Sequence, residues 1–178
     1  MQSGSDEEAT VTQDGSNNES AIIQSADSAT ATVTQPANNN RSNILQENDG
    51  VGVNAFLSSA TTTQTGSNNI ADVTQRGIVD ASTIIQAGSD NGAVVLQGQD
   101  SVSNLSFVSQ SGNFNSADLQ QGTDLIGEDD ADNESSINQQ ADNNIAFVRQ
   151  LSPANFSSVF RSVPAMKRGS RTKAIFSI

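Results

Sequence analysis

Residues 64–75 read QTGSNNIADVTQ, and the two glutamines that bound this stretch stand eleven residues apart. The same interval recurs along most of the chain. Glutamines in this phase are Gln13, Gln24, Gln35, Gln46, Gln64, Gln75, Gln86, Gln97, Gln110, Gln121, Gln139 and Gln150. Gln2 precedes the series by eleven residues, and Arg161 follows it by eleven. An interval kept over the whole chain predicts a repeat architecture.

The residues in front of each glutamine predict a β-strand. From Gln13 to Arg161, the residue four positions earlier is always Ala or Ser. The residue two positions earlier is aliphatic at every site except Thr62. A small residue, an aliphatic residue and Gln at alternate positions define one face of a strand, because successive side chains of a strand point to opposite sides. The short unit is therefore a strand followed by a turn.

A longer period lies within the short one. The fifth residue after every second glutamine is Asn, at Asn18, Asn40, Asn69, Asn91, Asn115 and Asn144. After the other glutamines that residue varies: it is Ala29, Val51, Asp80, Val102, Ile126 or Asn155. The longer spacings, after Gln46, Gln97 and Gln121, all fall in the variable turn. The true unit is thus two strands in 22 residues, with one rigid edge and one edge that tolerates insertions.

This pattern predicts an all-β protein, a β-solenoid of about six to seven two-strand rungs. Adjacent rungs are expected roughly 4.8 Å apart, so that equivalent residues form ladders along the axis. A buried amide without partners costs about 1–3 kcal/mol, but in a column each Gln donates to one neighbouring rung and accepts from the other. Gln64 and Gln75 are expected in two separate columns. The alternative is that these Gln and Asn residues are merely polar surface or linker residues. We reject it, because such a sequence would not keep Ala or Ser four residues before every glutamine of the series.

The chain divides into two parts. Residues 1–161 form the predicted solenoid, with irregular loops near 47–59, 98–105 and 122–134, and residues 162–178 form a basic tail. Residues 1–160 carry 20 acidic and three basic residues, whereas the end of the chain carries only basic ones. These are Arg161, Lys167, Arg168, Arg171 and Lys173. They predict either a segment that binds anionic surfaces or acidic subunits, or a solvated tail that limits stacking at that end.

Six segments match Gln-x4-Asn-x5-Gln, beginning at Gln13, Gln35, Gln64, Gln86, Gln110 and Gln139. This motif resembles the curlin repeat, the unit of bacterial curli fibre subunits, over about residues 2–161. The family repeat also carries Ser six residues before its first Gln. Only Ser58 agrees; the other five positions hold Glu7, Ala29, Asp80, Asn104 and Asn133.

The resemblance implies a secreted subunit that stacks end to end into an extracellular cross-β amyloid fibre for adhesion and biofilm matrix. The chain starts with no charged segment followed by an apolar one, so either the protein stays inside the cell or a signal peptide has been removed. The resemblance implies the second, with a cell-surface location. The implied partners are other copies of the chain, other curlin-type subunits, secretion and nucleation factors, and peripherally the outer cell surface. Whether the chain is a main or a nucleating subunit stays open.

Two further patterns suggest other functions. The acidic run Glu128, Asp129, Asp130, Asp132 and Glu134 supplies oxygen ligands of the kind calcium prefers, but its spacing fits no calcium-binding loop and favours a solvated loop. Thr-x-Thr at residues 10–12, 32–34 and 61–63 resembles the arrays of ice-binding solenoids. The array ends at Thr83 and Ile85, and exposed strands favour Thr in any case. An ice-binding or monomeric adhesive solenoid is therefore the rival interpretation.

The composition disfavours enzymatic chemistry. The chain has no His, Cys, Trp or Tyr, so it lacks the commonest general base and the thiolate ligands of metals. Its carboxylates fall on turns, without aromatic residues to shape a pocket. The acidic body lacks the basic stripe of a nucleic-acid-binding protein. We expect neither an enzyme nor a cofactor, and no nucleic-acid partner.

Overall fold

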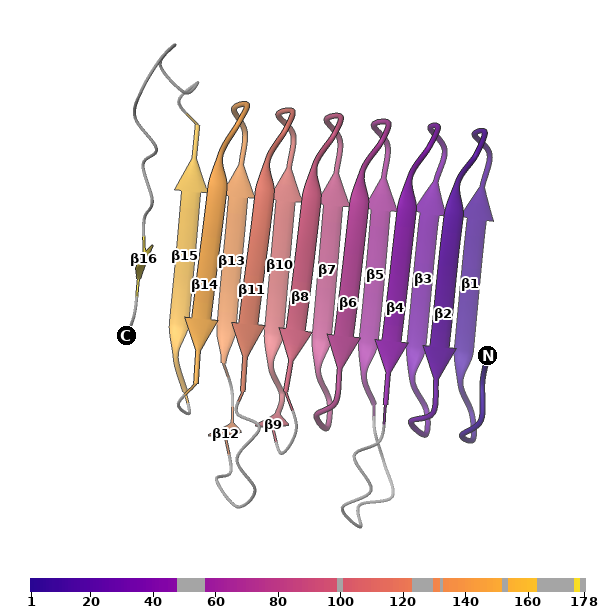
Figure 1. The fold of residues 1–178 in the computed structure, drawn as a ribbon. Coiled ribbons are helices and arrows are strands. Elements are labelled where there is room, and N and C mark those ends of the chain that lie inside the picture. Colours follow the sequence, from indigo (N-terminus) through magenta and orange to yellow (C-terminus); the bar gives the residue numbers. More distant parts are fainter. Residues whose placement is uncertain are drawn as a thin grey trace.

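The computed structural model describes residues 1–47, 57–98, 101–122, 130–131, 133–151, 154–162 and 175–176. Its strands form two parallel sheets that face each other, each with seven strands (Figure 1). Along the chain, successive members of these two sheets alternate between them, so each pair makes one turn of a flattened coil. The predicted β-solenoid of about six to seven rungs is confirmed.

The first sheet contains the strands that follow the variable turns. In spatial order these are β1 (Glu8–Gln13), β3 (Thr30–Gln35), β5 (Ser59–Gln64), β7 (Ala81–Gln86), β10 (Leu105–Gln110), β13 (Glu134–Gln139) and β15 (Phe156–Arg161). The second sheet contains β2 (Glu19–Gln24), β4 (Arg41–Gln46), β6 (Ile70–Gln75), β8 (Gly92–Gln97), β11 (Ser116–Gln121), β14 (Ile145–Gln150) and β16 (Ile175–Phe176).

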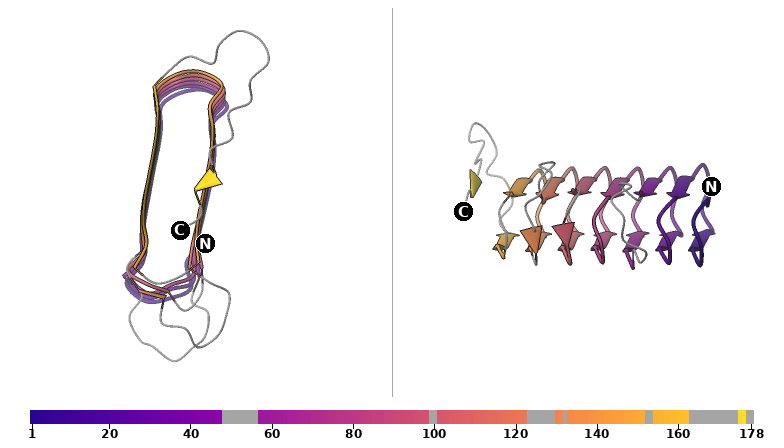
Figure 2. Two further views of the ribbon diagram at one scale, coloured as in Figure 1. Left: turned by 90° about the vertical axis from the view of Figure 1, so that its left-hand side faces the viewer. Right: turned by 90° about the horizontal axis from the view of Figure 1, so that it is seen from below.

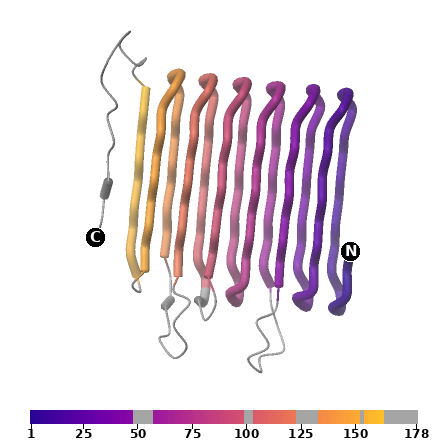
Figure 3. Tube along the Cα trace, viewed as in Figure 1, coloured from indigo at the N-terminus to yellow at the C-terminus, as the bar shows by residue number. Residues whose placement is uncertain are grey.

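The coil is narrow and regular. Seen along its axis, the rungs superpose on one elongated outline, and β1 and β15 lie at opposite ends of the stack (Figure 2). The colour of the tube changes steadily from one end to the other, since each coil lies beside those before and after it in the sequence (Figure 3). Residues one repeat apart therefore become neighbours, as Val11 and Val33 do in the pairing of β1 with β3.

Alternation within each strand builds the core. In β7 the residues Ser82, Ile84 and Gln86 are buried, while Ala81, Thr83 and Ile85 are partly exposed. The inward aliphatic side chains of both sheets meet in one cluster that runs through the stack, and Ala residues at the inward small position lie in the same cluster. Small residues there let the two sheets approach closely, because nothing larger than a methyl or hydroxyl group separates them.

The Asn turn is rigid because of its backbone conformation. The residue before the inward Asn of this turn has a positive φ in all six copies: Asn17, Asn39, Asn68, Asp90, Phe114 and Asn143, with values from 56° to 60°. Asn and Asp adopt this left-handed conformation more readily than most residues. The repeated Asn-Asn pair in the sequence therefore has two roles, since the first residue makes the turn and the second faces inward.

The opposite edge carries the chain segments of variable length. Within two of the segments expected as irregular loops, β9 (Ser101–Val102) and β12 (Asp130–Ala131) pair in parallel. The two insertions extend from neighbouring rungs at the same edge of the coil, so the backbones of β9 and β12 come within pairing distance. The segment expected as a basic tail contains β16, which pairs with β14 through Ile175 and Phe176. No helix of the described residues is long and apolar enough to cross a membrane.

Candidate functional site: the buried amide ladders

From β1 to β10, the glutamine that ends each strand of the first sheet is bonded to the glutamine of the next strand. The side chains of Gln13, Gln35, Gln64, Gln86, Gln110 and Gln139 form one continuous column. In each pair Nε2 of the earlier residue donates to Oε1 of the later one, across 2.6 to 2.9 Å. All members after Gln13 are fully buried.

The second sheet holds an equivalent column. It begins at Gln2 and continues through Gln24, Gln46, Gln75, Gln97, Gln121 and Gln150, with donor–acceptor distances of 2.8 to 3.2 Å. Gln64 and Gln75 thus lie in different columns, eleven residues apart in sequence and on opposite sheets. The role of these columns in self-assembly stays a prediction.

Each amide makes a further bond that the sequence pattern did not reveal. From Gln24 to Gln150, Nε2 also donates to the backbone carbonyl of the first residue of a strand in the facing sheet; Gln86 donates to Ile70 O at 3.0 Å and Gln75 to Ser59 O at 2.9 Å. From Gln24 to Gln121 both hydrogens of the amide are therefore used, and its oxygen accepts from the neighbouring rung. A buried amide satisfied in this way escapes the desolvation penalty and ties the two sheets together.

The asparagines of the rigid turn form their own columns. The backbone N–H of each Asn donates to Oδ1 of the Asn one rung earlier, as in Asn69 to Asn40 at 2.9 Å and Asn91 to Asn69 at 3.0 Å. The series starts at Asn18 and continues through Asn115 to Asn144. Asn69 Nδ2 also donates to Gly88 O of the next turn. This Asn holds its own turn in register with both neighbours.

A second inward column lies at the variable turn, and the sequence pattern missed it. It consists of the residues directly before the strands of the first sheet: Glu7, Ala29, Ser58, Asp80, Asn104, Asn133 and Asn155. Asp80 Oδ1 accepts from Asn104 N, and Asn133 Oδ1 accepts from Asn155 N. When positions are counted forward from the preceding glutamine, the insertions shift the count, and these residues no longer fall at equivalent positions. Counting six residues back from the following glutamine recovers them, at the position where the curlin repeat has Ser.

Not every inward polar group is satisfied. The hydroxyl groups of Ser42, Ser82, Ser135 and Thr62 are buried and have no hydrogen-bond partner among the described residues. Ser occupies the small position in about half the strands, where its size matters more than its hydroxyl. Thr62 occupies the aliphatic position between Val33 and Ile84. It is the exception noted in the sequence, and its environment is that of Val.

The other predicted residues fall largely outside this site. Arg161 ends β15 and lies beside Gln139, whereas Lys167, Arg168, Arg171 and Lys173 lie outside the described residues. Of the acidic run, Glu128, Asp129 and Asp132 also lie outside them. Among the residues searched, no group of three acidic, His or Cys side chains is placed to hold a metal ion.

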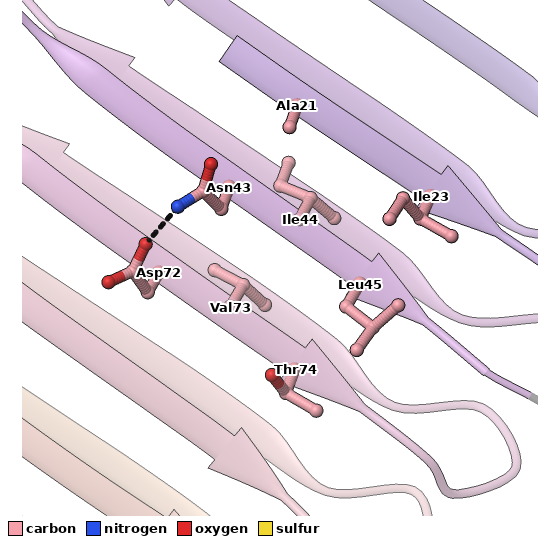
Figure 4. Close-up of a pocket in the computed structure, with 8 residues that line it drawn as sticks. All are labelled: Ala21, Ile23, Asn43, Ile44, Leu45, Asp72, Val73 and Thr74. Atoms are coloured by element: carbon pink, nitrogen blue, oxygen red, sulfur yellow. Dashed lines mark hydrogen bonds between the residues drawn. The ribbon is translucent and has the colours of Figure 1, made fainter. Parts of the chain in front are cut away.

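A shallow hollow of about 430 Å³ lies on the outer face of the second sheet (Figure 4). It is lined by Ala21, Ile23, Asn43, Ile44, Leu45, Asp72, Val73 and Thr74. Its one carboxylate is already engaged, since Asp72 accepts from Asn43 at 2.7 Å and from Arg41 at 3.4 Å. The hollow therefore presents an ion-paired carboxylate among aliphatic side chains, with no second acid or base in its lining to form a catalytic pair.

The two ladders and the stacked coil define a β-solenoid held in register by side-chain amides. Residues 4–36 match the family model of the curlin associated repeat, which confirms the resemblance to the curlin-repeat family within that segment. That family is one of structural fibre proteins, not of enzymes. The searches of curated proteins and of solved structures found no match.

Proposed function

We propose that this protein is the structural subunit of an extracellular, curli-like amyloid fibre that serves adhesion and the biofilm matrix. The observation that carries the proposal is that the amide ladders join rung to rung as far as Gln139 in the first sheet and Gln150 in the second, and that the first sheet ends in β1 and β15, each with a free edge. All six residues of β1 are exposed. An edge strand presents unpaired N–H and C=O groups, which are a template for another strand.

The same repeat that joins rungs within the chain would join chains to one another. In the stack each added rung supplies a partner for an amide, a backbone edge and an aliphatic side chain. A second copy placed on the end supplies the same three. The partners of the chain are then other copies of itself, with other curlin-type subunits and secretion and nucleation factors at the cell surface.

Fibre formation is tested with the purified chain. On incubation, thioflavin fluorescence should rise, and oriented fibres should give a meridional reflection at about 4.8 Å, the spacing of strands along the axis. A chain that stays monomeric for days without that reflection would overturn the proposal. Addition of trace amounts to a second curlin-type subunit distinguishes the two subunit types, since a nucleator shortens the lag of the other chain at low molar ratio.

One observation favours a second candidate. Thr10, Thr32 and Thr61 stack in register on the outer face of the first sheet, and Thr12, Thr34 and Thr63 form a parallel column. Such an array suits a monomeric ice-binding or adhesive solenoid. The second column ends where Thr63 pairs with Ile85. Thermal hysteresis of the freezing point, measured on the monomer, separates the candidates, because a fibre subunit gives none.

A further inference from the structure

The amide ladders have a direction, and the two ends of the stack therefore differ chemically. Every bond between ladder glutamines has its donor on the rung nearer the N-terminus and its acceptor on the rung nearer the C-terminus. The bonds to backbone carbonyls fix this orientation, because a reversed amide would place its oxygen against a carbonyl oxygen. An open ladder ends in an acceptor at one end and a donor at the other.

The N-terminal end of the first sheet presents the acceptor. Gln13 is exposed and donates to Gln35, while nothing in the described part of the chain donates to Gln13 Oε1. The strand that carries it is flanked by carboxylates, since Glu8 begins β1 and Asp14 follows it, and both are exposed. Val11 lies at the open end of the aliphatic column and is 46% exposed, whereas Val33 beneath it is fully buried.

At the C-terminal end of the same sheet, the ladder position presents donors only. Arg161 takes the ladder position after Gln139, in direct register with it. Gln139 Nε2 donates to Ser116 O, and no further acceptor for it lies among the described residues. A guanidinium has five N–H donors and no acceptor, so it cannot continue the chain of amides from Gln139. Arg161 Nη2 is buried and has no hydrogen-bond partner within the described ranges.

We infer that the first strand of a second copy, β1, stacks on β15 and that its Gln13 amide oxygen accepts from the Arg161 guanidinium. This inference rests on the proposed fibre function and names the joint between its subunits. Continuing the parallel register places Val11 of the second copy on Val159, which closes the aliphatic column. The carboxylates of Glu8 and Asp14 then approach the cationic end of the stack, and charge-assisted bonds are the stronger kind.

The same chemistry disfavours the other two ways of joining ends. Two N-terminal ends would set β1 antiparallel to β1, which brings Glu8 of one copy close to Asp14 of the other. Two C-terminal ends would set β15 antiparallel to β15, so that each Arg161 lies opposite Phe156 of the other copy and meets no amide oxygen. Like charges in contact discriminate against wrong partners. The subunits therefore join in one orientation, with the N-terminal rung of one on the C-terminal rung of the next.

Two full-length variants that complement each other test the joint. Arg161→Glu should slow elongation about tenfold, since it sets a carboxylate against the Gln13 oxygen, and Gln13→Lys should do the same by setting an ammonium group against Arg161. A 1:1 mixture has two good joints. The introduced carboxylate meets the introduced ammonium group in one joint, and the original Arg161 meets the original Gln13 in the other. The mixture should therefore elongate at close to the rate of the unmodified chain, into fibres that contain both variants alternately.

Controls separate this joint from the fibre itself. Arg161→Gln extends the amide ladder and should keep elongation within about threefold of the unmodified rate. Each variant is first checked as a monomer by circular dichroism and thermal unfolding. If the unmodified chain forms no fibres, the proposed function fails. If it forms fibres but Arg161→Glu elongates equally fast, or the mixture is no faster than either variant alone, the fibre stands and this joint is wrong.

Discussion

Gln64 and Gln86 stand 22 residues apart in the sequence, and Gln64 Nε2 donates to Gln86 Oε1 across 2.9 Å inside the stack. Gln86 in turn donates to Gln110 Oε1 and to Ile70 O. One side chain therefore joins three rungs and both sheets. A polar group at a fully buried position is stabilising here only because its neighbours repeat it.

Replacing Gln86 by Leu should cost more than about 2 kcal/mol of the free energy of unfolding, because Gln64 Nε2, Gln110 Oε1 and Ile70 O all lose a buried partner. Urea unfolding of the monomer measures this. Gln13→Leu is the matched control: Gln13 is exposed and makes one ladder bond, so its loss should stay within about 1 kcal/mol. Equal effects at the two positions would contradict a buried ladder.

Gly88 lies where a methyl group does not fit. A Cβ built there would overlap Gly112 O, a backbone atom of the next turn. Gly88→Ala should therefore destabilise the monomer by about 1–3 kcal/mol, since the turn has to move away from its neighbour. At Gly92, by contrast, an added Cβ meets no atom within 4 Å, so Gly92→Ala should raise the melting temperature slightly. Thermal unfolding followed by circular dichroism measures both variants. If the turns stack as described, the melting temperature falls for Gly88→Ala and rises for Gly92→Ala.

Thr62→Val should stabilise the protein by about 1–2 kcal/mol, because it removes a buried hydroxyl group without a described partner and keeps the shape of the side chain. The new residue also continues the aliphatic column between Val33 and Ile84. The free energy of unfolding in urea tests the prediction. Thr63→Val is the control on the outward face and should change stability by less than about 0.5 kcal/mol. A destabilised Thr62→Val variant would show that the hydroxyl is bonded.

Val79 is a β-branched residue with a φ of 63°, a conformation that β-branched side chains avoid. Val79→Asn should stabilise the monomer by about 1 kcal/mol, since Asn tolerates the left-handed region. The control is Val94→Asn, which makes the same change at a similarly exposed position in the middle of β8. That variant should gain nothing, because strands disfavour Asn. The melting temperatures of the two variants are compared with that of the unmodified chain. A gain at residue 79 alone indicates a backbone effect, and a gain at both positions indicates a general effect of polarity.

Asp118 makes stability depend on pH. It lies on the outer face of β11 between Val94 and Phe147, and its burial raises the pKa of the carboxyl above the ordinary value. The folded state therefore holds this proton more tightly than the unfolded state does. The charged carboxylate destabilises the fold above the raised pKa, and this penalty is relieved as the pH falls through it.

Asp118→Asn should consequently be more stable than the unmodified chain at pH 7, with a difference that shrinks toward pH 3. Chemical unfolding across that range measures the effect. Asp72→Asn provides the comparison on the same face, because Asp72 already accepts from Asn43 and Arg41, and the substitution removes one acceptor oxygen and the ion pair with Arg41. A gain at pH 7 from both variants would point to the overall negative charge instead of to the site of Asp118.

Much of this fold was predictable because its period is short and its exceptions are few. The strand phase follows directly from the residues before each glutamine, so β7 ends at Gln86 and β6 at Gln75 as the pattern indicates. The separation of Gln64 and Gln75 into two columns follows from the alternation of Asn and variable turns. Both inferences need only the order of residues along one chain.

Other features depend on how the two sheets are offset, which the period does not encode. The bond from Gln86 to Ile70 O requires the start of β6 to lie opposite the end of β7. The column that contains Asp80 and Asn104 was hidden by insertions of unequal length. β9 pairs with β12 because the two insertions that contain them extend from adjacent rungs at the same edge of the coil. The first feature needs the offset between the two sheets, and the other two need the course of the insertions; the period gives neither.

The unequal edges of the coil separate the length of the chain from the height of the stack. Residues 36–40 connect β3 to β4 and residues 47–58 connect β4 to β5, yet both strands on either side pair with the next rung in unbroken register. Added sequence at the variable edge thus leaves the rise of the stack unchanged. In the proposed fibre, foreign peptides inserted there would be displayed along one side, once per subunit.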